Sequence, residues 1–177
     1  ITSAPFNKEA FHLAGYQAMD DMTYYEECFA KGAAYQVGEV AGIEPRPIRA
    51  LQDAGYIPVV APTAGDETGA TYNINADLVA GEVADGLVAE KLVLLTDTDG
   101  ILDRQGRLLS TLSRPDLDRL IADGTISRGM LPKVQACLTA LNAGVQKTHI
   151  INGTRQHALI EELLRPEGVG TELVAGR

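Results

Sequence analysis

The chain has 177 residues, which is enough to bury a sizeable core within one domain. Apolar residues make up 45% of it and charged residues 22%, a balance that excludes a wholly disordered protein. The net charge of −9, without a visible cluster of Lys and Arg, argues against nucleic acid as a partner. No run approaches the length of a membrane span, and residues 1–12 lack the features of a signal sequence. We therefore expect no membrane partner and a cytoplasmic protein or a processed organelle enzyme.

Residues 1–34 differ in character from the rest of the chain. They contain all three Phe and three of the six Tyr, and residues 6–32 have the pattern of a helix with an acidic face. We expect residues 1–34 to be a helical segment of uncertain origin and residues 35–177 to be the main lobe. Cys28 and Cys137 have no CxxC motif or His cluster nearby, which favours reduced, partly buried thiols and predicts no metal ligands.

From residue 35, short β-rich runs alternate with helical runs. This alternation predicts parallel strands joined by right-handed helical crossovers. In chain order we expect a strand at 35–40, a helix at 46–55, a strand at 56–62, a helix after Asp77, a strand at 91–96, a small hairpin around Gly106, a helix at 115–124 capped by Ser113, a helix at 130–142, a strand at 148–152, a helix at 157–164 and a strand at 171–174.

Three loops follow strands of this sheet and are candidate ligand sites, because ligands of open parallel sheets bind outside the carboxyl ends of the strands. The first leads into Asn73, Asn75 and Asp77, the second is residues 96–100, and the third is residues 127–133. Asn and Asp are also the usual residues of turns and N-caps. Asn75 or Asp77 could therefore simply cap the following helix, and the second loop could be an ordinary turn.

Lys133 is the most unusual of these residues because it falls in the first turn of a predicted helix. A cation there is disfavoured by about 0.3 to 1 kcal/mol, and a bound anion would reverse the sign. Gly129 would let backbone amides approach a ligand closely, and Pro132 suits the first helical turn. These are the parts of a phosphate site, although an exposed lysine after a Gly-Pro helix start explains the same residues.

Five segments taken in order resemble the carboxy-terminal, nucleotide-binding half of N-acetylglutamate kinases, which are members of the amino acid kinase family. They are "YNINAD", "LVLLTDTDGIL", "GTISRGMLPKVQACL", "HIINGTRQHALIEELL" and "EGVGTELV", within residues 35–174. The resemblance implies an α/β fold, a three-layer αβα sandwich with a mainly parallel sheet. It implies transfer of the γ-phosphate of ATP, with Mg2+, to the side-chain carboxylate of N-acetyl-L-glutamate in arginine biosynthesis.

The resemblance also implies roles for single residues. Asp77 would organise catalytic lysines, Lys133 would neutralise charge on the transferring phosphoryl group, and Asn73 would hold the acetylamino acid. Thr96 and Asp97 would lie against the nucleotide, with two further contacts beside Lys133. Those further nucleotide contacts are Gly129 and Met130.

The chain departs from the family in two places. Arg128 precedes Gly129 where family members commonly have a second glycine, which either adds a phosphate contact or crowds the loop. The Lys-x-Gly-Gly loop, a second glycine-rich loop and a substrate-binding Arg of the amino-terminal half are not found in residues 1–34. We therefore expect a partial kinase that lacks the amino-terminal substrate lobe and does not turn over alone.

Alternatives to this kinase remain open at the level of sequence. One is a kinase of carrier-linked aminoadipate, and the other is a nucleotide- or arginine-binding regulatory module of the same fold without turnover. Arginine-inhibited relatives bind the effector at positions that match His149, Glu162 and Gly168. The segment "GTRQHALIEELL" resembles plant and cyanobacterial forms that associate with the PII signalling protein. A plastid stroma is the alternative to a cytoplasmic location. A complete enzyme is expected to be a homo-oligomer.

Overall fold

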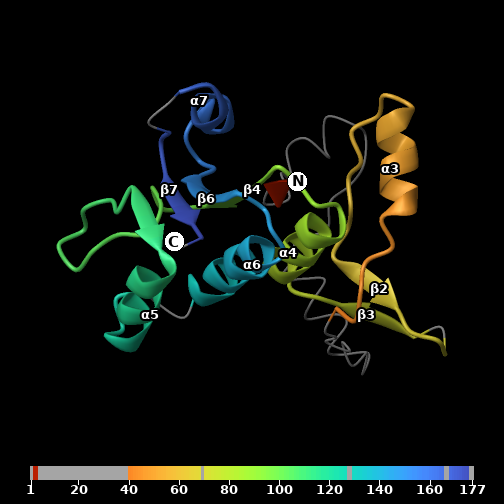
Figure 1. Ribbon diagram of the computed structural model, residues 1–177, viewed down its shortest axis with the longest axis horizontal. Helices are drawn as coiled ribbons and strands as arrows, with labels where there is room; N and C mark the ends of the chain where they lie inside the picture. Colours follow the sequence, from red (N-terminus) through yellow and green to blue (C-terminus); the bar gives the residue numbers. More distant parts are fainter. Residues whose placement is uncertain (1, 4–39, 69, 127–128, 166–167, 176–177) are drawn as a thin grey trace, which may run out of the picture.

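The computed structural model describes residues 2–3, 40–68, 70–126, 129–165 and 168–175 (Figure 1). Its helices and strands are, in chain order, β1 (Thr2–Ser3), α3 (Arg46–Asp53), β2 (Thr63–Gly65), β3 (Thr71–Asn73), α4 (Ala76–Gly86), β4 (Lys91–Thr96), β5 (Thr111–Ser113), α5 (Arg114–Ala122), α6 (Leu131–Asn142), β6 (Lys147–Asn152), α7 (Ala158–Leu164) and β7 (Thr171–Val174).

A five-stranded sheet with the order β1-β4-β6-β7-β5 forms the middle of the molecule. Neighbouring strands are parallel except for β6 and β7, which are antiparallel. The mainly parallel sheet is therefore confirmed. β4 and β6 are in register from Lys91 opposite Lys147 to Thr96 opposite Asn152, so both strands end at the same edge of the sheet. The loop of residues 96–100 begins at this edge.

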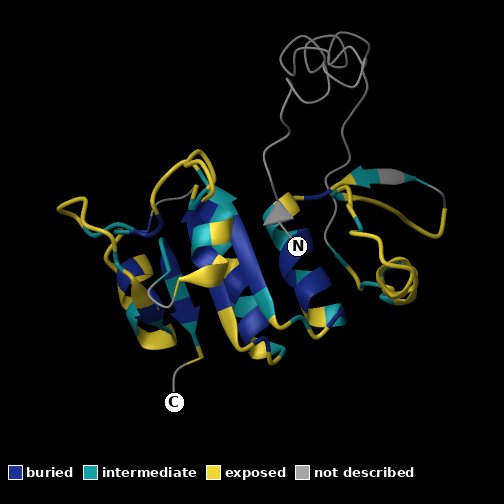
Figure 2. Ribbon diagram, turned by 90° about the horizontal axis from the view of Figure 1, so that it is seen from above, coloured by how far each residue is buried: buried dark blue, intermediate teal, exposed yellow. Residues whose placement is uncertain are grey.

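Helices cover both faces of the sheet and confirm the three-layer αβα sandwich. Figure 1 shows α4, α5 and α6 on one face and α7 on the other. The main core fills the first interface; it includes Ala80 and Ala84 of α4, Leu92 and Leu94 of β4, Leu117 of α5, Val134 and Cys137 of α6, Ile150 of β6 and Leu173 of β7. Val93 and Ile151 face the other way and pack against Ala158 of α7. The apolar run of β4 is uninterrupted because both of its faces are buried (Figure 2).

The loop and helix predictions from residue 91 onward are confirmed. Leu102 and Leu108 bridge the small hairpin around Gly106. The backbone amide and hydroxyl of Ser113 donate to the Asp116 carboxylate at 3.1 and 2.5 Å, which fixes the start of α5. Cys137 is a free thiol as predicted, but it is fully buried, and burial raises its pKa to about 12.

The strand predicted over residues 56–62 is wrong. This segment has no regular structure, and the side chains of Ile57 and Val59 are 91% and 96% exposed. Strand structure begins only at β2, which pairs antiparallel with β3 in a separate two-stranded hairpin. A strand needs a neighbour for its backbone groups, and the described part of the chain offers none to this apolar run. Composition alone does not show whether that neighbour exists.

Two amino-terminal predictions fall largely outside the described residues. The helix over residues 6–32 lies entirely outside them, as does Cys28, and of the strand predicted at 35–40 only Val40 is described, without strand structure. Thr2 and Ser3 pair in parallel with Val93 and Leu94 of β4 and so add an edge strand to the sheet. The boundary at residue 34 stays a prediction. No helix within the described ranges is long and apolar enough to cross a membrane.

Candidate active site

Asn75 is the residue that caps α4. Its side-chain oxygen accepts hydrogen bonds from the backbone amides of Asp77 at 3.0 Å and Leu78 at 3.2 Å, two donors that have no partner within the helix. The capping interpretation is thus confirmed for Asn75. The side chain of Asp77, in the first turn, is left available for another contact.

That contact is with Lys133 of α6, which is 56 residues away in sequence. The ammonium nitrogen donates to both carboxylate oxygens of Asp77, at 2.8 and 3.1 Å. The two side chains are only 17% and 13% exposed. An ammonium has three N–H donors, so this geometry leaves one of them for a further acceptor.

Lys133 lies in the first turn of a helix, as predicted, and the anion beside it is the Asp77 carboxylate. Lys133 is the third residue of α6, after Pro132 in the first turn. The Asp77 carboxylate compensates for the unfavourable helix dipole at Lys133, while its own place at the start of α4 is favourable. The unusual lysine therefore does not by itself require a bound phosphate.

The second loop, residues 96–100, is held by turn contacts at the end of β4. The Thr96 hydroxyl donates to Asp97 at 3.2 Å, and the side-chain amide of Asn152 donates to Asp99 at 2.9 Å. Asn152 was not selected in the sequence, although it ends a strand that we expected to be parallel to the one ending at Thr96. Gly100 is buried at φ +142, where a Cβ would lie 2.6 Å from the Thr171 hydroxyl. The turn therefore needs glycine at this position.

Three further residues predicted for nucleotide or substrate lie within four positions of Asp77 or Lys133 in sequence. Gly129 is exposed, and a Cβ built on it would have no atom within 4 Å, so the backbone there is open to a ligand. Met130 precedes α6 and packs against the main core. Asn73 ends β3 with an exposed side chain. In the described ranges no hydrogen bond joins Asn73 or Asp97 to Asp77 or Lys133.

His149, Glu162 and Gly168 meet at a second place, between β6, α7 and the loop before β7. The Nδ1 atom of His149 lies 2.5 Å from a Glu162 oxygen, and the two side chains are 6% and 3% exposed. The other Glu162 oxygen accepts from the amides of Val169 and Gly170 at 2.6 and 3.2 Å. A Cβ on Gly168 would lie 2.8 Å from the Glu162 carboxylate. Three residues selected from the sequence are therefore in direct contact.

A polar cavity of about 260 Å³ adjoins this cluster. Its titratable lining residues are Lys91, Lys147, His149, Glu162, Arg165 and Glu172. Lys147 pairs with Glu172 at 2.7 Å. Burial lowers the pKa of His149 and outweighs the opposite effect of the Glu162 carboxylate. Within the described ranges, its Nε2 atom has no hydrogen-bond partner.

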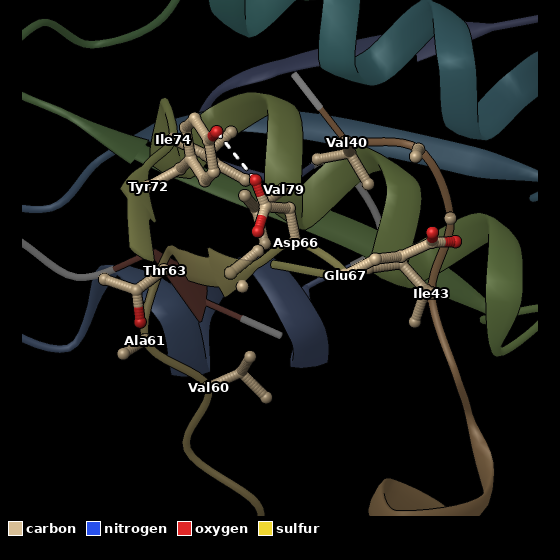
Figure 3. A pocket seen from close by; sticks show the side chains of 14 residues that line it. Val40, Ile43, Val60, Ala61, Thr63, Asp66, Glu67, Tyr72, Ile74 and Val79 are labelled. Carbon is tan, nitrogen blue, oxygen red and sulfur yellow. Dashed lines mark hydrogen bonds between the residues drawn. The ribbon is translucent and has the colours of Figure 1, made fainter. Parts of the chain in front are cut away.

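Another pocket, about 510 Å³, lies between the β2–β3 hairpin and α4 (Figure 3). Its lining includes the apolar side chains Val40, Ile43, Val60, Ala61, Ile74 and Val79, together with the acidic Asp66 and Glu67. The lining contains no Lys, Arg or His and none of the residues predicted for a site. Its chemistry therefore does not suit an anionic ligand.

The sequence model of the amino acid kinase family matches residues 4–152. The chain belongs to the amino acid kinase family. The match begins within the segment of residues 1–34. The acetylglutamate kinase of Methylobacillus flagellatus is 51% identical over 140 residues, which cover 79% of this chain and 48% of that protein. The chain spans about half the length of the curated relatives it matches.

Solved structures agree with this amino acid kinase assignment. The Streptococcus mutans protein smu.665 is 28% identical with a TM-score of 0.68, over 90% of this chain and 56% of that one. The N-acetylglutamate synthase of Neisseria gonorrhoeae, solved with coenzyme A and L-arginine, is 23% identical with a TM-score of 0.71, over 90% of this chain and 47% of that one. The second likeness concerns the fold alone.

Proposed function

We propose that the chain is the nucleotide-binding part of an acetylglutamate kinase of arginine biosynthesis. The reaction would transfer the γ-phosphate of ATP to the side-chain carboxylate of N-acetyl-L-glutamate. The contact between Lys133 and Asp77 is the observation that supports it best, because it places an oriented cation at the start of a helix whose amides also attract anions. The acetylglutamate kinases that match the chain support the substrate.

In this proposal the chain contributes charge and positioning. Lys133 neutralises negative charge that develops on the transferring phosphoryl group, and Asp77 holds the ammonium in place. The acceptor is already a carboxylate, so no general base is needed. Asn73 would hold the acetylamino acid.

ATP and Mg2+ fit the residues present at this edge of the sheet. The open backbone at Gly129 and the free N–H of Lys133 suit phosphate oxygens. Thr96, Asp97 and Met130 would lie along the nucleotide. Magnesium, held mainly by the substrate phosphates, would neutralise their charge.

The other partners are part of the same proposal. Arginine would bind as an effector near His149, Glu162 and Gly168. The polar cavity there is lined by two glutamates, and the Nε2 atom of His149 has no hydrogen-bond partner among the described residues. Association with PII, assembly into a homo-oligomer and a cytoplasmic or plastid location stay predictions. A regulatory binding module of the same fold without turnover is the second candidate.

Calorimetry with ATP and Mg2+ tests the proposal by binding, which a kinase requires. We expect Lys133→Met to weaken affinity by ~1.5 to 3 kcal/mol, the scale of a charge-assisted hydrogen bond. Lys147→Met is the matched control, because it removes another lysine paired with a carboxylate but far from the helix start. Circular dichroism checks that each variant is folded. Equal affinities for wild type and Lys133→Met would contradict the assignment.

A further inference from the structure

A glycine in α4 touches the backbone of α6. Gly81 is buried, and a Cβ built on it would lie 2.8 Å from the carbonyl oxygen of Ala136, 3.0 Å from its Cα and 3.2 Å from its Cβ. Two of these three atoms belong to the backbone, so they cannot rotate away as a side chain would. Any side chain at Gly81 therefore requires the two helices to move apart.

This crossing point lies one turn from the ion pair on each helix. Gly81 follows Asp77 by four residues, and Ala136 follows Lys133 by three, so both spacings are close to one helical turn. The contact between Gly81 and Ala136 and the contact between Asp77 and Lys133 are thus about one turn apart along α4 and α6. A change in the separation of the helices at Gly81 would therefore change the distance between the Asp77 carboxylate and the Lys133 ammonium.

We propose that Gly81 is a positioning residue that sets the separation of α4 and α6 at which Asp77 holds the Lys133 ammonium. Asp77 is short and moves with α4. If α4 moves away from α6, the contacts of 2.8 and 3.1 Å lengthen and the ion pair weakens. The expected loss of nucleotide affinity rests on the proposed function, whereas the expected weakening of the Asp77–Lys133 contact does not.

A double-mutant cycle measures the ion pair without any ligand. Asp77→Asn, Lys133→Met and the double variant are unfolded in urea in three backgrounds: wild type, Gly81→Ala and Gly86→Ala. Gly86 is the matched control because it lies in the same helix, but its Cβ would meet the side chain of Ile43 at 3.2 Å and not α6. We expect the coupling factor between Asp77 and Lys133 to fall about threefold or more in Gly81→Ala and to stay unchanged in Gly86→Ala.

Nucleotide affinity provides the second measurement. Gly81→Ala should weaken ATP–Mg2+ binding while Gly86→Ala does not, and adding Ala136→Gly should restore part of it, because this removes one of the three atoms near the new Cβ. If no variant binds nucleotide, the proposed function fails while the cycle still tests the role of Gly81. If Gly81→Ala does not fold, the cycle is run in Gly81→Ala/Ala136→Gly and compared with Ala136→Gly. Equal coupling factors with and without the Gly81 substitution would overturn the inference.

Discussion

At the scale of single residues, the three polar side chains before α4 have different surroundings. Asn73 is exposed, Asn75 accepts two backbone hydrogen bonds, and Asp77 contacts Lys133. Their alternate spacing predicts a shared direction, but capping draws the Asn75 side chain onto the helix start. Asn75 therefore differs in direction from the other two residues because it caps the start of α4.

Replacing Asn75 with Ala should reduce the free energy of unfolding by about 1 kcal/mol, because two amides of α4 lose their acceptor. Urea denaturation measures this change. Asn75→Asp should restore most of it, since Asp caps equally well, and Asn73→Ala, at an exposed position two residues earlier, should be close to neutral. Equal effects of Asn73→Ala and Asn75→Ala would contradict the assignment of the cap.

At the scale of elements, the β2–β3 hairpin depends on one carboxylate in its turn. One oxygen of Asp66 accepts from the amide of Thr68 at 2.8 Å, its hydroxyl at 2.6 Å and the amide of Ala70 at 3.0 Å. The other oxygen accepts from the Tyr72 hydroxyl at 2.9 Å (Figure 3). The hydrogen bonds from Thr68 and Tyr72 lower the pKa of Asp66 to about 2.

The hairpin should therefore be sensitive to acid. Because the pKa of Asp66 is lower in the folded chain, its stabilising contribution is complete above the ordinary value of 3.8 and is lost as the pH falls towards 2. We expect the amide of Ala70 to exchange faster in Asp66→Asn than in wild type at pH 6, and this difference to shrink between pH 4 and 2. Hydrogen exchange read by NMR measures both. A difference that persists unchanged to pH 2 would contradict the role of the carboxylate.

At the scale of the whole molecule, exposed apolar side chains gather in one stretch. Among the large exposed hydrophobic residues of the described ranges, five lie between positions 51 and 60: Leu51, Tyr56, Ile57, Val59 and Val60. Such a patch is unusual on a protein that functions without a partner surface. In the part of the chain that the structure describes, residues 56–62 pair with no strand.

We expect Ile57→Lys/Val59→Lys to reduce both the binding of a hydrophobic dye and aggregation at high concentration, because charge on an unpaired apolar run opposes association. The free energy of unfolding should change little, since both side chains are almost fully exposed. Leu163→Lys/Leu164→Lys on α7 is the control for exposed apolar residues elsewhere. Dye fluorescence and light scattering measure the outcome, and equal values for wild type and the 57/59 variant would contradict it.

The sequence by itself determined most elements from α3 onward, because their signals are local. The start of α5 at Ser113, the uninterrupted apolar run of β4 and the Gly-Pro start of α6 can each be recognised within a few residues. Lys133 is unusual by its own place in the first turn of a helix. The roles of Asp77, His149, Glu162 and Gly168 come from the resemblance to a family.

Only the tertiary structure decided which of these residues touch. Asp77 meets Lys133 across 56 residues because α4 and α6 approach closely at Gly81, a contact with no sequence signal of its own. It also decided that residues 56–62 are not a strand: a helix satisfies its backbone within one segment, whereas a strand exists only where another strand accepts its hydrogen bonds. A local sequence pattern therefore predicts a helix, but it cannot show whether a strand has a neighbouring strand to pair with.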